Sequence, residues 1–323
     1  MSPDAEAGDG TLAPDQAFAV LGNETRMAIL QDLAEAAGPL SFSELRERVG
    51  VSDSGQFNYH LGKLEGHFLN KIDGEYSLRQ AGRRVIESVL SGAVTEASVI
   101  EPTRLDEPCP YCGANIEISF REERLLIRCT ECPGTFPGKT STSPAFGDLP
   151  EGAITLYNLP SAGLEGRTTR EQLHAVLAYT FSEQMALGNG VCPRCSGSIE
   201  FELVLCERHE ADGDYCERCN SRFPMVVVSE CVNCGYLSKG TMRFYLSANP
   251  TVRSFFEARG IDPIAPEWED MSLLYNREET VTGTDPFEAE IVYRLDGDEL
   301  EVTIDENLSV VAVTERISRE IES

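Results

Sequence analysis

Eleven cysteines and one histidine form the clearest chemical pattern in this sequence of 323 residues. Ten of the cysteines come in C-x-x-C pairs, and the spacing C-x-x-H occurs in the stretch CERHEADGDYCERC over residues 206–219. An odd number of cysteines cannot all form internal disulfides, whereas His209 brings the number of soft ligands to twelve. Twelve ligands are enough for three four-coordinate zinc ions per chain.

The first cluster, CPYCGANIEISFREERLLIRCTEC, spans residues 109–132. Two short strand-like runs flank the polar turn REER, so a hairpin returns both C-x-x-C pairs to one point. Four thiolates leave no open position on the metal, which favours structural zinc over catalytic zinc or a redox C-x-x-C motif. The predicted ligands are Cys109, Cys112, Cys129 and Cys132.

The second cluster begins as a repeat of the first, because CPYCGANIEISF resembles CPRCSGSIEFEL from residue 192 onward. A strand rises about 3.3 Å per residue, so the run SIEFELVL takes Cys206 far from Cys195. Sequential pairing is therefore strained, nested pairing is favoured, and interleaved pairing stays open. The nested sites are Cys192, Cys195, Cys231 and Cys234 at the hairpin base, and Cys206, His209, Cys216 and Cys219 at its tip.

Residues 11–92 show helical apolar periods and then a short hairpin. In SGQFNYHLGKLEGHF, from residue 54, apolar side chains at helical spacing predict one buried stripe: Phe57, Leu61, Leu64 and Phe68. The polar side chains of this helix therefore face outward. Two strand-like runs follow around Asp73-Gly74, a dipeptide that favours a tight hairpin turn.

With ETRMAILQDL, FSELRERVGVS, FNYHLGKLEGHF and the Asp-Gly hairpin in this order, residues 11–92 resemble the ArsR-like winged helix-turn-helix transcription regulators of archaea. The resemblance implies that the helix of residues 53–67 enters the major groove of double-stranded DNA. It implies base-reading from Ser54, Gln56, Asn58 and Tyr59, and phosphate contacts from Lys63, Lys71, Arg83 and Arg84. The alternatives are plain solvated side chains and a winged helix that binds protein.

The net charge of −27 would ordinarily argue against a nucleic-acid partner. Residues 11–92 nevertheless hold eight basic and eleven acidic side chains, a balance of only −3. The chain contains four lysines, and this excess of acids with few lysines resembles proteins of halophilic archaea. We interpret the acidity mainly as a surface suited to high salt rather than as a patch for one partner.

The sequence predicts an α+β chain in which a winged helix-turn-helix is followed by zinc-ribbon hairpins and a C-terminal α+β region. In that last region MRFYLS (242–247) predicts a strand, NPTVRSFFEARGIDP a helix, and residues 287–316 three strands. The predicted segments are a disordered acidic tail (1–10), the winged helix-turn-helix domain (11–92), a linker (93–106), zinc ribbon 1 (107–140), a linker and bridging helix (141–190), zinc ribbon 2 with two zinc sites (191–240), and an effector or dimerisation region (241–323).

The predicted function is a sequence-specific, DNA-binding transcription regulator, acting as a homodimer. Winged helix followed by zinc ribbon also resembles the alpha subunit of archaeal transcription factor E, which implies RNA polymerase as a partner. No Ser-His-Asp set, phosphate loop or dinucleotide fingerprint is visible, so we expect no enzyme. No apolar run approaches the roughly 18 residues of a membrane span, so a soluble cytoplasmic protein is expected.

Overall fold

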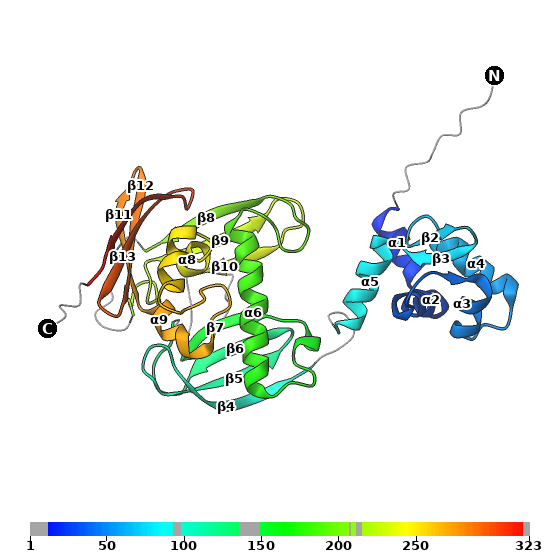
Figure 1. The fold of residues 1–323 in the computed structure, drawn as a ribbon, viewed down its shortest axis with the longest axis horizontal. Coiled ribbons are helices and arrows are strands. Elements are labelled where there is room, and N and C mark those ends of the chain that lie inside the picture. Colours follow the sequence, from blue (N-terminus) through cyan, green and yellow to red (C-terminus); the bar gives the residue numbers. More distant parts are fainter. Residues whose placement is uncertain (1–11, 93–97, 136–148, 207, 211–214, 319–323) are drawn as a thin grey trace, which may run out of the picture. The chain divides into compact units, whose positions relative to one another are not determined.

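A computed structural model describes residues 12–92, 98–135, 149–206, 208–210 and 215–318 of the chain (Figure 1). The chain divides into two compact units, Met1–Glu96 and Ala97–Ser323. The predicted acidic tail, 1–10, lies outside the described residues. Both units combine helices with antiparallel sheets, so the predicted α+β class is confirmed at this level.

The first unit contains five helices and a three-stranded antiparallel sheet of order β1-β3-β2 in its described residues. Its elements are α1 (Pro14–Leu21), α2 (Glu24–Glu35), β1 (Leu40–Ser41), α3 (Phe42–Val49), α4 (Ser54–Leu64), β2 (Leu69–Ile72), β3 (Glu75–Leu78) and α5 (Gln80–Leu90). Polar caps start three of the helices: Asn23 caps α2, Ser41 forms a capping box in α3, and Asp53 caps α4. Asp73 and Gly74, both at positive φ, form the predicted hairpin turn.

The core of the first unit depends on α4. Its predicted apolar stripe is buried, with Phe57, Leu61, Leu64 and Phe68 each at most 6% exposed. These side chains belong to one cluster with residues of α2, α3 and α5. Burial of this stripe fixes the opposite side of α4 toward solvent.

The second unit begins with a four-stranded antiparallel sheet of order β4-β5-β6-β7. Its strands are β4 (Ile100–Pro108), β5 (Asn115–Arg121), β6 (Arg124–Cys129) and β7 (Ala153–Asn158). One segment prediction is therefore wrong in part, because most of β4 lies in the predicted linker 93–106. β4 is a mostly exposed edge strand with two prolines, so it lacks the alternating pattern that identifies a strand.

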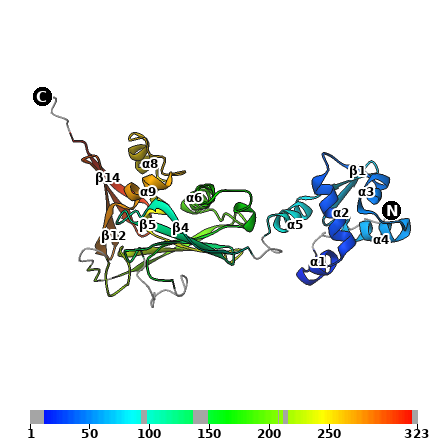
Figure 2. The same cartoon turned by 90° about the horizontal axis from the view of Figure 1, so that it is seen from below.

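A long helix and a second sheet follow. The predicted bridging helix is α6 (Thr169–Gly188), which Thr168 starts with a capping box. The second sheet has the order β10-β9-β8, from β8 (Ile199–Leu205), β9 (Met225–Cys231) and β10 (Leu237–Gly240). The segment MRFYLS is not a strand but the helix α7 (Met242–Leu246); all five of its residues are buried, so no one-sided helical period is visible. α6 contacts β7 and α7, and α7 contacts β9, which links the two sheets (Figures 1 and 2).

The C-terminal part adds two helices and a third antiparallel sheet, of order β11-β12-β13-β14. These elements are α8 (Pro250–Glu257), α9 (Met271–Tyr275), β11 (Arg277–Thr284), β12 (Phe287–Leu295), β13 (Asp298–Asp305) and β14 (Val310–Arg316). The three predicted strands are confirmed, and β11 was not predicted. One apolar cluster includes residues of all three sheets of this unit. Among the described residues, no helix has both the length and the apolar character needed to cross a membrane.

Candidate metal centres and candidate nucleic-acid interface

The structure brings the twelve predicted ligands together in three groups of four. Within each group the Sγ atoms, with one imidazole nitrogen in the third group, all lie within 4.8 Å of one another. The grouping is the nested one, with one site at the base of the β8–β9 hairpin and one at its tip. The groups are Cys109, Cys112, Cys129 and Cys132 in centre 1; Cys192, Cys195, Cys231 and Cys234 in centre 2; and Cys206, His209, Cys216 and Cys219 in centre 3.

The sulfur positions in centres 1 and 2 match tetrahedral coordination. In centre 1 the Cys109 and Cys132 Sγ atoms are 3.7 Å apart, and those of Cys112 and Cys129 are 3.5 Å apart. Centre 2 repeats these distances, with 3.7 Å from Cys192 to Cys234 and 3.5 Å from Cys195 to Cys231. Four sulfurs at Zn–S distances of 2.3 Å would be about 3.8 Å apart, so the observed groups fit a four-thiolate ion.

Four ligand pairs share one backbone turn, which holds both cysteines toward the ion. In each turn the backbone N–H of the first cysteine donates to the carbonyl of the residue five positions further along the chain. The carbonyl of the same cysteine accepts a hydrogen bond from the N–H of the residue four positions further along. The residue after the second cysteine has a positive φ in all four turns: Gly113, Ser196, Asn220 and Gly235. Gly and Asn tolerate this conformation, so C-x-x-C-G is a sequence signal for the turn that residue spacing alone does not use. Pro133 follows Cys132, and that pair lacks the shared pattern.

Backbone and side-chain N–H groups donate to the sulfurs. The Glu131 N–H lies 3.3 Å from the Cys129 Sγ, and the Arg194 N–H lies 3.4 Å from the Cys192 Sγ. The Asn233 amide donates to the Cys195 Sγ at 3.5 Å and, with backbone and thiol neighbours, lowers the pKa of that cysteine to about 6. Such donors stabilise thiolate, the form that binds metal.

Centre 3 supplies its histidine in a defined tautomer. The His209 Nε2 lies 3.2 Å from the Arg222 carbonyl oxygen, which can only accept, so Nε2 carries the proton. Nδ1 is then the ligand nitrogen, and it lies 3.4 Å from the Cys219 Sγ. Burial lowers the pKa of His209, which favours the neutral imidazole that binds metal.

Arg222 connects centre 3 with the first ribbon, a role that no motif in the sequence predicts. Its Nε donates to the Gly134 carbonyl at 2.5 Å and its backbone N–H donates to the Thr135 carbonyl at 3.3 Å. Its guanidinium lies 4.2 Å from the centre of the Tyr111 ring. The tip of the second hairpin is thereby attached to the segment that follows Cys132.

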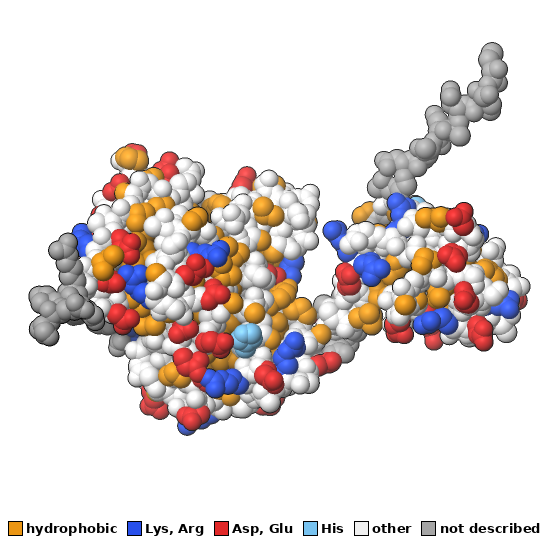
Figure 3. Space-filling model, viewed as in Figure 1, with side chains coloured by type: hydrophobic (Ala, Val, Ile, Leu, Met, Phe, Trp, Pro, Cys, Tyr) orange, Lys and Arg blue, Asp and Glu red, His pale blue; other side chains and the backbone are white. Residues whose placement is uncertain are grey.

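The predicted DNA-reading side chains lie on the solvent side of α4. Ser54, Gln56, Asn58, Tyr59 and Lys63 are all exposed, and the Lys63 ammonium lies 5.5 Å from the centre of the Tyr59 ring. Among the described helices of the first unit, α4 alone contains no Asp or Glu. In the view of Figure 3, acidic side chains are spread over both units rather than gathered in one patch.

The predicted phosphate contacts do not all lie near α4. Lys71 is exposed on β2, in the hairpin that follows α4. Arg83 and Arg84 are exposed on α5, and Figures 1 and 2 both show α5 and α4 at opposite ends of this unit. The structure therefore groups Lys63 and Lys71 with the candidate reading helix and separates Arg83 and Arg84 from it.

Comparison with known proteins finds two family models. Residues 106–310 match the model described as Domain of unknown function (DUF7351), which covers more than half of the chain and all twelve ligands. Residues 14–89 match the model described as Domain of unknown function (DUF7347), which covers α4 and the hairpin. No curated protein and no solved structure matches.

Proposed function

The chain belongs to the family described as Domain of unknown function (DUF7351), and from that premise we propose that it is a DNA-binding transcription regulator whose second unit is stabilised by three structural zinc ions. The proposal of DNA binding rests on α4, whose exposed side is polar and free of acidic residues in a chain of net charge −27. With 54 acidic residues in 323, a helix of 11 residues would hold about two on average, and α4 has none between its caps Asp53 and Glu65, which supports a side that can approach phosphate.

The arrangement around α4 supports a helix-turn-helix. A four-residue connection, residues 50–53, joins α3 to α4, and Gly50 at φ 77° turns the chain there. The β2–β3 hairpin follows directly, as a wing would. Gln56 and Asn58 carry amides that pair bidentately with adenine in the major groove, while Lys63 and Lys71 supply phosphate contacts.

The three ligand groups support zinc as the metal. Thiolate-rich tetrahedral groups suit zinc, and centres 1 and 2 leave no position for a substrate. Metal binding supplies folding free energy that short hairpins cannot obtain from burial alone. The role of the ions in this proposal is therefore to hold the hairpin ends, while Cys and His ligands take no part in a reaction.

Metal stoichiometry tests the zinc part. Native mass spectrometry of the full chain should give three zinc ions, and His209→Ala should give two, because the other ligand groups stay complete. His174→Ala, a substitution outside all three groups, is the control and should keep three. Three ions in His209→Ala would show that centre 3 does not use this histidine.

Duplex titration tests the DNA part. Gln56→Ala and Asn58→Ala should each cost about 1–3 kcal/mol at a cognate site and little on scrambled duplex, because they remove base contacts. Lys71→Ala should weaken both duplexes alike and reduce the salt dependence. If no duplex binds at any salt concentration, the protein-binding reading of the first unit replaces ours. Genomic occupancy at most promoters would instead favour a general factor similar to transcription factor E.

A further inference from the structure

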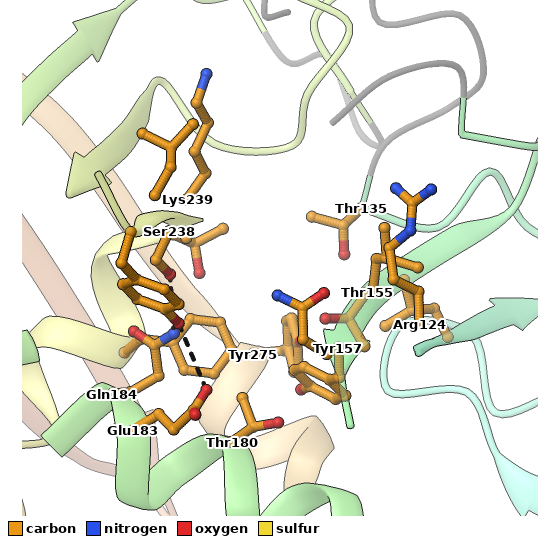
Figure 4. Close-up of a pocket in the computed structure, with 18 residues that line it drawn as sticks. Arg124, Thr135, Thr155, Tyr157, Thr180, Glu183, Gln184, Ser238, Lys239 and Tyr275 are labelled. Atoms are coloured by element: carbon orange, nitrogen blue, oxygen red, sulfur yellow. Dashed lines mark hydrogen bonds between the residues drawn. The ribbon is translucent and has the colours of Figure 1, made fainter. Parts of the chain in front are cut away.

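A cavity of about 160 Å³ lies between the first two sheets of the second unit (Figure 4). β7 forms one wall and β10 the other, and each is an edge strand of its sheet. The remaining lining comes from α6, α7 and Tyr275 of α9, together with Arg124 of β6 and the connecting residues Thr135, Tyr236 and Thr241. The cavity is close in volume to one that admits a single six-membered ring, so its ligand is a small molecule rather than a peptide.

Three buried polar atoms of the lining have no hydrogen-bond partner among the described residues. They are the Thr180 and Thr241 hydroxyls and Oε1 of Gln184. Each of these residues is at most 7% exposed. A buried polar group without a partner destabilises the fold, so three around one cavity indicate a polar ligand that satisfies them.

A buried cation lies behind this lining. Arg243 is 1% exposed, and among the described residues no carboxylate pairs with it. Its guanidinium is instead 4.1 Å from the Phe244 ring centre and 4.4 Å from that of Tyr275, and its Nη2 donates to the Tyr275 hydroxyl at 3.4 Å. Tyr157 is its other polar neighbour, and no acidic group among the described residues pairs with Nε or Nη1. An unpaired buried charge favours an anion close by.

The cavity walls add positive charge on both sides. Arg124 lies on the side of the first sheet and Lys239 on that of the second (Figure 4). The carboxylate of the lining, Glu183, is already engaged, since its Oε1 lies 2.8 Å from the Arg194 guanidinium and its Oε2 accepts from the Tyr236 hydroxyl at 3.4 Å. Arg124 is in turn paired with Glu122 at 3.5 Å, and Glu202 acts on Lys239, so the preference of the cavity for an anion rests on Arg243 behind its lining.

We propose that this cavity binds a small hydroxy- or amino-carboxylic acid. The carboxylate accepts hydrogen bonds from the lining hydroxyls, near Arg243, and the hydroxyl or amino group of the ligand donates to Gln184 Oε1. Such a ligand would join the edge of one metal-bearing sheet to the edge of the other. The site is separate from α4 and does not depend on whether the first unit binds DNA.

The first test uses the full metal-loaded chain without DNA. Glycolate, L-lactate, glycine and L-serine are titrated by calorimetry and by thermal unfolding, against their counterparts without a carboxylate: ethylene glycol, 1,2-propanediol, glycinamide and L-serinamide. At least one acid should bind and raise Tm, and its counterpart should not. If none of the acids binds, the cavity holds water only; if the counterparts bind equally well, the carboxylate assignment is wrong.

The second test locates the site. Thr180→Val removes a buried hydroxyl at nearly constant shape, so it should raise the Tm of the ligand-free chain while weakening acid binding at least tenfold. Ser182→Ala, on the exposed side of α6, is the matched control and should leave binding unchanged. Thr241→Val serves as the second cavity variant should Thr180→Val fail to fold. Wild-type affinity in folded cavity variants would overturn the site.

Discussion

Gly62 lies on the exposed side of α4, and replacing it with alanine separates stability from DNA binding. A Cβ added there would meet no heavy atom within 4 Å, and the residue is helical, so no contact within the chain requires glycine. Alanine is more favourable than glycine in a helix interior by about 0.8–1.0 kcal/mol. We therefore expect Gly62→Ala to stabilise the first unit by about that amount, which raises its Tm by roughly 4–8 °C for a domain of this size.

The same substitution should weaken duplex binding. In the proposed DNA complex, the absence of a Cβ at position 62 would let a DNA backbone approach the helix closely, and a methyl group there would push it away. We expect about a tenfold loss of affinity, or ~1.4 kcal/mol, with similar loss on cognate and scrambled duplexes. Differential scanning calorimetry of the full chain measures the stability change, and a fluorescence anisotropy titration measures the affinity.

Gly82→Ala is the matched control in α5. A Cβ at this buried position would lie 2.4 Å from the Phe68 carbonyl oxygen, so this alanine must destabilise the unit. Opposite signs of the two Tm changes would support the packing argument. A Gly62→Ala chain that is more stable and binds duplex as tightly as wild type would refute the role of Gly62 in close approach, and a less stable chain would refute the stability argument.

Two further predictions concern stability. The Arg277 and Glu279 side chains on β11 are fully buried, with 2.7 Å between Nη2 of Arg277 and Oε1 of Glu279. Arg277→Met should lower the free energy of unfolding by about 3–5 kcal/mol, because it leaves a lone buried carboxylate. Adding Glu279→Leu to Arg277→Met should recover most of that loss, as measured by chemical denaturation. Hydrogen bonds from Ser41 lower the pKa of Glu44. Their contribution to stability is therefore fully present above pH 4.5, the ordinary pKa of this group, and is lost as the pH falls through the lowered pKa. Ser41→Ala should therefore lower the unfolding midpoint more at neutral pH than in acid, where only the pH-independent bond from the Glu44 N–H to the Ser41 hydroxyl is lost; an equal loss at both pH values would refute the bond between the Ser41 hydroxyl and the Glu44 carboxylate.

Sequence periodicity predicted the elements that have one clearly buried side. The stripe from Phe57 to Phe68 depends on local spacing, and the structure contains it. The nested ligand grouping also followed from a local quantity, the rise of a strand between Cys195 and Cys206. Local geometry was sufficient in these cases because the partners are close in sequence.

Elements whose environment depends on distant segments were not predictable in the same way. α7 is buried on all sides by other elements, so its residues show no helical period, and β4 is an edge strand without alternation. The contacts of Arg222 with Gly134 and Thr135 join segments 87 or more residues apart, and the three unpartnered atoms of the cavity come from α6 and from Thr241, which precedes α7. Only the folded chain brings such groups together.

The contact between Trp268 and the first ribbon gives the protein an intrinsic optical reporter. The chain contains one tryptophan, which is 4% exposed and donates its indole N–H to the Pro108 carbonyl at 2.8 Å, one residue before the ligand Cys109. Emission from this indole therefore reports on the start of centre 1, while centre 2 and centre 3 have no tryptophan of their own. Fluorescence during slow chelation can thus time the loss of one metal ion independently of the others, without a dye or an introduced label.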